Sequence, residues 1–427
     1  MKNNFKYVVM TLLFMAAFCF QANTASALDD VNFCFYYQSI EGVKQINEPI
    51  TEDDSLWTKI KKTGKKAVNW VASGWENAIT RNFALGDGGE STWYSGKDPN
   101  IAYNVKRTKV TSEAELLAAM GAKSESELSN GQKALLASFR TAYSDAMKSR
   151  ADASFRSSVN VILTDTTGYD DEKKYPNVRS DFWPYSSGFT IQMSSNCYNY
   201  PGGEEDASST MIHEYSHSMD LTLKELINPY GLDGSHYGNE VTGKRSAFVE
   251  AWAEYNEMIE SEKEAMGIIK NTQKLVVESK TVAGSYSVLL PEDATSEQLM
   301  AAESYLALLL YRLSQNLDDG EAKITEAFTD TRWKVWRTMP TLIQKLIKNN
   351  PEDAAKIVAT VDEVFLGKLS DDELLDYCGK SDAVKAYIAT RGQAKDADVE
   401  MTEEIKATAS EKPLEVEAES DSPFSVR

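Results

Sequence analysis

Two histidines one helical turn apart constrain the fold of this chain more than any other feature. They lie in residues 210–217, which read TMIHEYSH and contain the pattern H-E-x-x-H. On a helix, His213 and His217 face the same side, and two neutral imidazoles at that spacing can bind one zinc ion. The carboxylate of Glu214 between them can act as a general base on a metal-bound water. The pattern therefore predicts a helix with one side packed in the core and another facing a metal-binding cleft.

A catalytic zinc site needs a third protein ligand and an open position. Glu250 is the strongest candidate, because it lies among apolar residues in a predicted helix over 246–266, where a half-buried carboxylate favours a cation. Glu254, one turn further on, is predicted to accept a hydrogen bond from the free ring nitrogen of a ligating histidine. His236 is the rival third ligand, in a glycine-punctuated loop over 231–243.

The same loop holds the candidates for stabilising the transition state. His236 could donate a hydrogen bond to the developing oxyanion, and Tyr237 beside it could do the same. An exposed loop histidine without a catalytic role is an equally good interpretation of His236, since most loop residues are solvent-exposed. Leu223 stands where a metzincin would need a third histidine, which disfavours that class.

The two motifs together point to a family. HEYSH at 213–217 with EAWAE at 250–254 resembles the gluzincin metallopeptidases, most closely the branch of anthrax lethal factor and the Pro-Pro endopeptidases. The resemblance covers roughly residues 159–266 and implies a zincin fold, with residues 188–194 as the edge strand along which a peptide substrate lies. It also implies zinc ligands at His213, His217 and Glu250 and a general base at Glu214. The aminopeptidase sequence Gly-x-Met-Glu-Asn is absent, which favours an endopeptidase.

The first 27 residues predict a secretory signal peptide. Lys2 and Lys6 are followed by an apolar run over 8–20 and by an A-x-A cleavage site at 25–27. A membrane anchor is the alternative interpretation, although the run is short for a bilayer. No later segment has the length and apolar character of a membrane span, so we expect a secreted or periplasmic protein without stable membrane insertion after cleavage.

Composition narrows the partners of the chain. A formal net charge of −20 over 427 residues argues against nucleic-acid binding, which requires a basic surface. The expected partner is a protein or peptide substrate, and the sequence carries no signal for an oligomeric state. The basic segment over 53–80 is an exception to the acidic composition: its lysines could contact an anionic surface, or they could simply be solvated, as most charge runs are.

The order of predicted elements indicates the α+β class, with a zincin-like core of a small sheet and the HExxH helix, followed by a largely α-helical C-terminal part. We expect strands over 31–37, 158–165 and 188–194, a loop over 83–104, and helices over 112–120, 131–150 and 246–266. The predicted domains are listed in chain order: signal peptide 1–27, mixed and mostly helical region 28–150, catalytic core 151–270, helical subdomain 271–395, and acidic disordered tail 396–427.

The cysteine count limits covalent cross-linking in the mature chain. Without the predicted signal peptide, Cys34, Cys197 and Cys378 remain, so at most one internal disulfide can form.

The function expected from these features is that of an exported zinc endopeptidase, in which a Glu general base and a zinc-activated water hydrolyse the peptide bond. An inactive zincin-like exported binding protein is the main alternative, because a fold and a motif do not guarantee activity. Zinc-dependent hydrolysis of a cell-wall cross-link is a third, for which the sequence offers no wall-binding repeat.

Overall fold

The computed structural model describes residues 32–47, 51–65, 89–98, 100–144, 158–169, 171, 173–187, 190–219, 241–260, 263–269, 274–279, 284–289, 294–331 and 337–391. The predicted signal peptide and acidic tail lie outside these residues. No helix among them has the length and apolar character needed to cross a membrane.

A mixed six-stranded sheet forms the N-terminal part, in the order β2-β3-β1-β4-β6-β5. Its strands are β1 (Asn32–Gln45), β2 (Gly89–Tyr94), β3 (Ile101–Val110), β4 (Ser158–Asp165), β5 (Tyr185–Ser187) and β6 (Thr190–Ser194). Strands β1, β4 and β6 run parallel, whereas β3 and β5 are antiparallel to their neighbours. The parallel strands are rich in β-branched and aromatic residues, as expected for strands buried on both faces.

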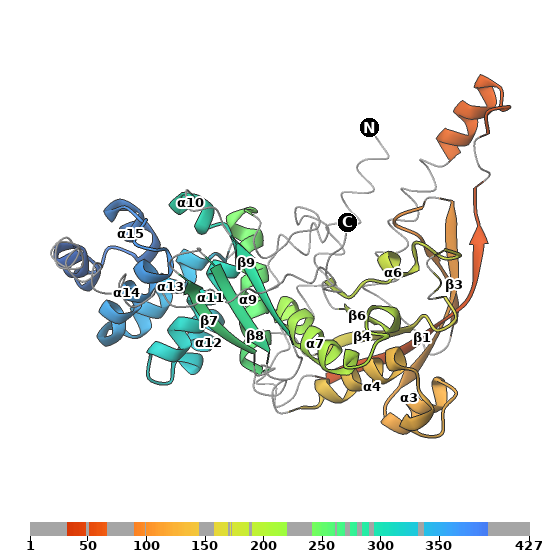
Figure 1. The fold of residues 1–427 in the computed structure, drawn as a ribbon, viewed down its shortest axis with the longest axis horizontal. Coiled ribbons are helices and arrows are strands. Elements are labelled where there is room, and N and C mark those ends of the chain that lie inside the picture. The colour runs from red at the N-terminus through yellow and green to blue at the C-terminus, as the bar shows by residue number, and fades with distance from the viewer. Residues whose placement is uncertain are drawn as a thin grey trace, which may run out of the picture.

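Separate apolar clusters lie around this sheet. The larger one joins Phe35, Val161 and Met193 from the strands to the helices α4 (Asn130–Ala142), α7 (Gly203–Met219) and α9 (Lys244–Glu260), and continues into the C-terminal helices. The smaller cluster includes Trp93 and Phe182, whose rings stack with centroids 5.5 Å apart. Helix α7 lies between the sheet and α9 (Figure 1), so it is packed from both sides.

The C-terminal part is mostly helical, as predicted (Figure 1). Its helices include α10 (Ser296–Leu299), α11 (Glu303–Asn316), α12 (Gly320–Asp330), α13 (Met339–Asn349), α14 (Ala354–Val364), α15 (Asp371–Cys378) and a further helix over residues 382–391. A three-stranded antiparallel sheet precedes them, of β7 (Lys263–Ile269), β8 (Lys274–Ser279) and β9 (Gly284–Leu289). The α+β class is therefore confirmed.

Several predicted elements are confirmed and others are wrong. The predicted helix over 112–120 is confirmed as α3 (Glu113–Ala119), which Ser112 caps. The predicted loop over 83–104 is wrong, because β2 and β3 pair there as antiparallel strands. The predicted helix over 246–266 ends at Glu260, and the chain then enters β7.

The edge-strand prediction is also wrong. Residues 190–194 form β6, which pairs with β4 on one side and β5 on the other, so β6 is internal. The short β5 is the edge strand instead, and it contacts α7.

Two further features bear on the predictions. Cys34, Cys197 and Cys378 are all free thiols, so none of the three pairs with another. Strands from both sides of the predicted boundary at residue 150 share the six-stranded sheet, because β1 pairs with β4. The division of the chain into domains stays a prediction.

Candidate metal centre

Helix α7 begins at Gly203, and a close approach of the chain fixes that start. A turn after Tyr198 brings the chain back so closely that a Cβ at Gly203 would overlap the Tyr198 carbonyl oxygen, so only glycine fits. Acidic side chains of the first turn, Glu204, Glu205 and Asp206, suit the positive end of the helix dipole.

The packing of α7 sets the direction of its histidines. Ile212 and Tyr215 form an apolar stripe buried in the main core, which is the packed side that the sequence predicts, and Met219 ends the described helix. His213 and His217 lie off that stripe with side chains 17% and 15% exposed, so they are sheltered without being sealed in the core. The pattern of apolar and polar residues thus predicts which side of the helix faces α9.

Helix α9 supplies the third side chain from a rigid position. Trp252 stacks on Phe328 of α12 with ring centroids 3.7 Å apart, and the Arg337 guanidinium lies 3.9 Å from the Phe328 ring centroid. Glu250 is two residues before Trp252 and therefore points to a different side of the helix. The stack anchors α9 in the helical C-terminal part while Glu250 faces α7.

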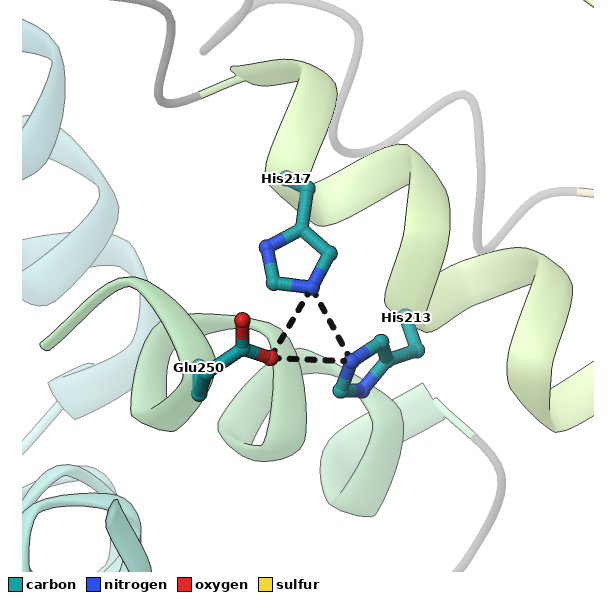
Figure 2. Close-up of side chains that lie close together, drawn as sticks. All are labelled: His213, His217 and Glu250. Carbon is teal, nitrogen blue, oxygen red and sulfur yellow. Dashed lines mark hydrogen bonds and ion pairs between the residues drawn. The ribbon is translucent and has the colours of Figure 1, made fainter. Parts of the chain in front are cut away.

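Three donor atoms from these helices form a nearly equilateral triangle (Figure 2). His217 Nε2 lies 3.0 Å from His213 Nε2 and 3.1 Å from Glu250 Oε2. The third side, from His213 Nε2 to Glu250 Oε2, is 3.5 Å. The three atoms thus converge on one point between α7 and α9.

This triangle fits a tetrahedral metal ion. Ligands bound at about 2.0–2.1 Å in tetrahedral geometry lie about 3.3 Å from one another, which falls within the three observed distances. Two imidazole nitrogens and one carboxylate oxygen are also a donor set that zinc accepts. His213, His217 and Glu250 are therefore a plausible metal-binding group, as the sequence motif predicts.

A carboxylate that contacts Nδ1 fixes the ring orientation of His213. Its Nδ1 lies 3.1 Å from Glu257 Oε2, and Ser209 donates a hydrogen bond to the other oxygen of the same carboxylate. A proton on Nδ1 leaves the Nε2 lone pair directed at the triangle, which is the tautomer that a metal ligand needs. Among the described residues, the buried Nδ1 of His217 has no such partner.

Glu257 is a residue of the site that the sequence pattern does not single out. A hydrogen bond of the kind predicted for Glu254 joins His213 Nδ1 to Glu257, which lies two helical turns after Glu250 and thus on the same face. The bond of Glu254 itself stays a prediction. Glu254 lies in the same cluster, since ligand-capable atoms of His213, Glu254 and Glu257 lie within 4.8 Å of one another. The spacing from Glu250 to Glu257 carries a signal for this role, but the nearer Glu254 satisfies the same pattern.

Electrostatic effects raise the pKa values of both His213 and Glu214. Burial disfavours the imidazolium of His213, but its hydrogen bonds to Glu250 and Glu257 and the charges of Glu257 and Glu214 raise its pKa well above the ordinary value. Burial raises the pKa of Glu214, and the two histidines only partly offset this effect. A carboxyl group with a raised pKa is a better proton acceptor, which suits a general base.

His236 and Tyr237 are outside the described residues, so their catalytic roles stay predictions. The alternative that His236 is the third metal ligand also stays a prediction.

Comparison of the chain with protein-family models, with curated proteins and with solved structures finds no match. The metal-binding assignment therefore rests on the geometry of the site.

Proposed function

We propose that the protein is an exported zinc endopeptidase of the gluzincin type. The triangle formed by His213, His217 and Glu250 is the observation that carries the proposal, because it has the size and chemistry of a zinc site. Glu214 on the same helix adds a buried carboxylate at the position that the H-E-x-x-H pattern assigns to the base. Zinc, when bound, lowers the pKa of a coordinated water and polarises a carbonyl oxygen.

The chain's own residues supply the other parts of the reaction. His213 and His217 present their Nε2 atoms to one point, and Glu257 keeps the His213 ring in that orientation. Glu214 accepts the proton of the attacking water and passes it to the leaving amine. Its raised pKa brings proton acceptance and donation closer to neutral pH.

The substrate in this proposal is an extended peptide that adds to the edge strand β5. Strand addition is a common mode of peptide recognition, because an edge offers unpaired backbone donors and acceptors. Strand β5 (Tyr185–Ser187) is the edge nearest α7 in the sheet order, which supports this placement. The preference for an endopeptidase follows from the absence of the aminopeptidase motif.

Substitution of Glu214 tests the proposal. Glu214→Gln should retain zinc, because Glu214 is not part of the donor triangle, and should lose roughly 10²–10⁴-fold in the cleavage rate of casein or a peptide library. Glu205→Gln, an exposed change on the first turn of the same helix, is the matched control and should cleave like the wild type. Metal content is measured on all three proteins.

Two results would contradict the mechanism. Equal cleavage by the wild type and by Glu214→Gln, with zinc bound to both, would exclude Glu214 as the base. A wild-type protein that binds no zinc and cleaves no peptide would instead favour the inactive binding protein with a zincin-like fold.

A further inference from the structure

A short helix near the N-terminus leaves three large apolar side chains in solvent. Its described residues are 56–65, and they stand apart from the sheet at the upper right of Figure 1. Leu56 and Trp57 are each 76% exposed and Ile60 is 53% exposed, whereas most large apolar residues of the described chain are in the core. Such a group of exposed apolar residues is typical of a binding surface.

The apolar side chains share one face of this helix. At 100° per residue, Leu56, Ile60 and Trp57 fall within an arc of about 100°. Four lysines occupy the rest of the helix surface, and the segment has no acidic residue. These are Lys59, Lys61, Lys62 and Lys65.

Local contacts hold this helix together. Ser55 Oγ accepts a hydrogen bond from the Thr58 backbone N–H, which caps the helix. Lys62 Nζ lies 2.9 Å from Asp54 Oδ2, and Lys59 Nζ donates to the Glu52 carbonyl oxygen. Two of the lysines therefore fasten the start of the helix. Lys61 and Lys65 are exposed.

We propose that the helix over 56–65 docks the protein onto an anionic lipid surface. An apolar face with tryptophan and leucine, bordered by lysines, is the pattern of a helix that lies in a membrane interface. The exposed Lys61 and Lys65, in a chain of net charge −20, also provide local charge complementarity to anionic headgroups. The proposal does not depend on the metal centre or on peptidase activity.

Lipid suits this helix better than the chain's own acidic tail. Residues 396–427 contain ten acidic residues and few apolar ones, so they could pair with the lysines but would leave Leu56, Trp57 and Ile60 largely uncovered. A bilayer interface can accommodate both the apolar side chains and the lysines, because apolar side chains enter the acyl boundary while lysines extend to the headgroups.

The docking should depend strongly on salt. The remainder of the chain is acidic and is repelled by an anionic surface, so attraction must come from the lysines within about a Debye length of the bilayer. Added salt screens that attraction and should release the protein.

Vesicle flotation of the full chain tests the proposal. The probes are vesicles of phosphatidylcholine alone and of phosphatidylcholine mixed with phosphatidylglycerol, each at low and high salt. We expect the wild type to float only with the anionic vesicles at low salt. Lys61→Glu with Lys65→Glu, and separately Trp57→Ser with Ile60→Ser, should each weaken partitioning at least about tenfold.

A charge-matched pair of substitutions provides the control. Lys348 and Lys356 are exposed on the C-terminal helices, so Lys348→Glu with Lys356→Glu changes the net charge equally and should leave flotation as in the wild type. Unfolding temperatures of all variants are compared, and no change is expected for these exposed positions. Equal flotation of the helix and control variants would overturn the proposal. So would no flotation of the wild type, together with binding of a 396–427 peptide that the Lys61/Lys65 variant loses, because the tail would then be the occupant.

Discussion

At the scale of single residues, the His213 ring is held between two carboxylates from the same helix. Glu250 faces its Nε2 at 3.5 Å and Glu257 faces its Nδ1 at 3.1 Å. Only the first of these carboxylates belongs to the donor triangle. The second acts through the ring, by fixing its tautomer and orientation.

Loss of the Glu257 carboxylate should therefore weaken metal binding. We expect Glu257→Gln to lower zinc affinity by about 10–100-fold, the usual effect of removing a carboxylate behind a ligating histidine. Glu254→Gln, one turn nearer the triangle, is the comparison and should have a smaller effect, because the 3.1 Å contact with His213 Nδ1 is made by Glu257. Competition titrations with a chelator measure both. A larger loss of zinc affinity for Glu254→Gln would show that Glu254, the residue that the sequence predicts, positions the histidine ring.

The raised pKa of His213 predicts how metal binding depends on pH. The imidazolium persists above the ordinary histidine pKa of about 6.5, because Glu250 and Glu257 outweigh the effect of burial. The metal must displace that proton, so lowering the pH should weaken zinc binding by about tenfold per unit while one proton is released. Chelator competition between about pH 6 and 8.5 checks the slope. An affinity that does not change across this range would show that His213 is already neutral there.

At the scale of elements, the sequence predicts the helix faces well and their ends poorly. The stripe of Ile212 and Tyr215 and the one-turn spacing of the histidines follow from helix geometry alone. The start of α7 at Gly203 depends instead on a close approach to Tyr198, which no local pattern reveals. The sequence does not reveal the hairpin of β2 and β3 either, because the glycine and serine content of this segment is typical of loops.

The start of α7 gives a prediction at this scale. Gly203→Ala should lower the free energy of unfolding by about 1–3 kcal/mol, because the added methyl group overlaps the Tyr198 carbonyl oxygen and that backbone must move. Gly89→Ala, where the added methyl group meets nothing within 4 Å, is the control and should change stability far less. Urea unfolding monitored by circular dichroism measures both. Equal free energies of unfolding for the two variants would mean that the turn before α7 rearranges at little cost in free energy.

At the scale of the whole molecule, the metal centre depends on strands far away in the sequence. The core runs from Phe35 and Tyr37 on β1 through the sheet to α7, and ring contacts link Phe33 of β1 to Tyr215 of α7 at 5.6 Å. Strand β1 pairs with β3 on one side and β4 on the other, so it is an interior strand of the sheet. Long-range pairing of this kind cannot be read from local spacing, so the sequence alone does not reveal that β1 is a part of the core.

Removal of residues 28–150 should therefore abolish folding. A chain of residues 151–427 lacks β1, β2, β3 and α4, which exposes the backbone edge of β4 and uncovers one side of α7. An exposed edge of this kind favours aggregation. We expect this chain to show no cooperative unfolding transition and no stoichiometric zinc binding, whereas a chain of residues 28–427 should retain both. Calorimetry and metal analysis compare the two. A soluble 151–427 protein with a sharp transition and bound zinc would show that the N-terminal region is dispensable, as a propeptide would be.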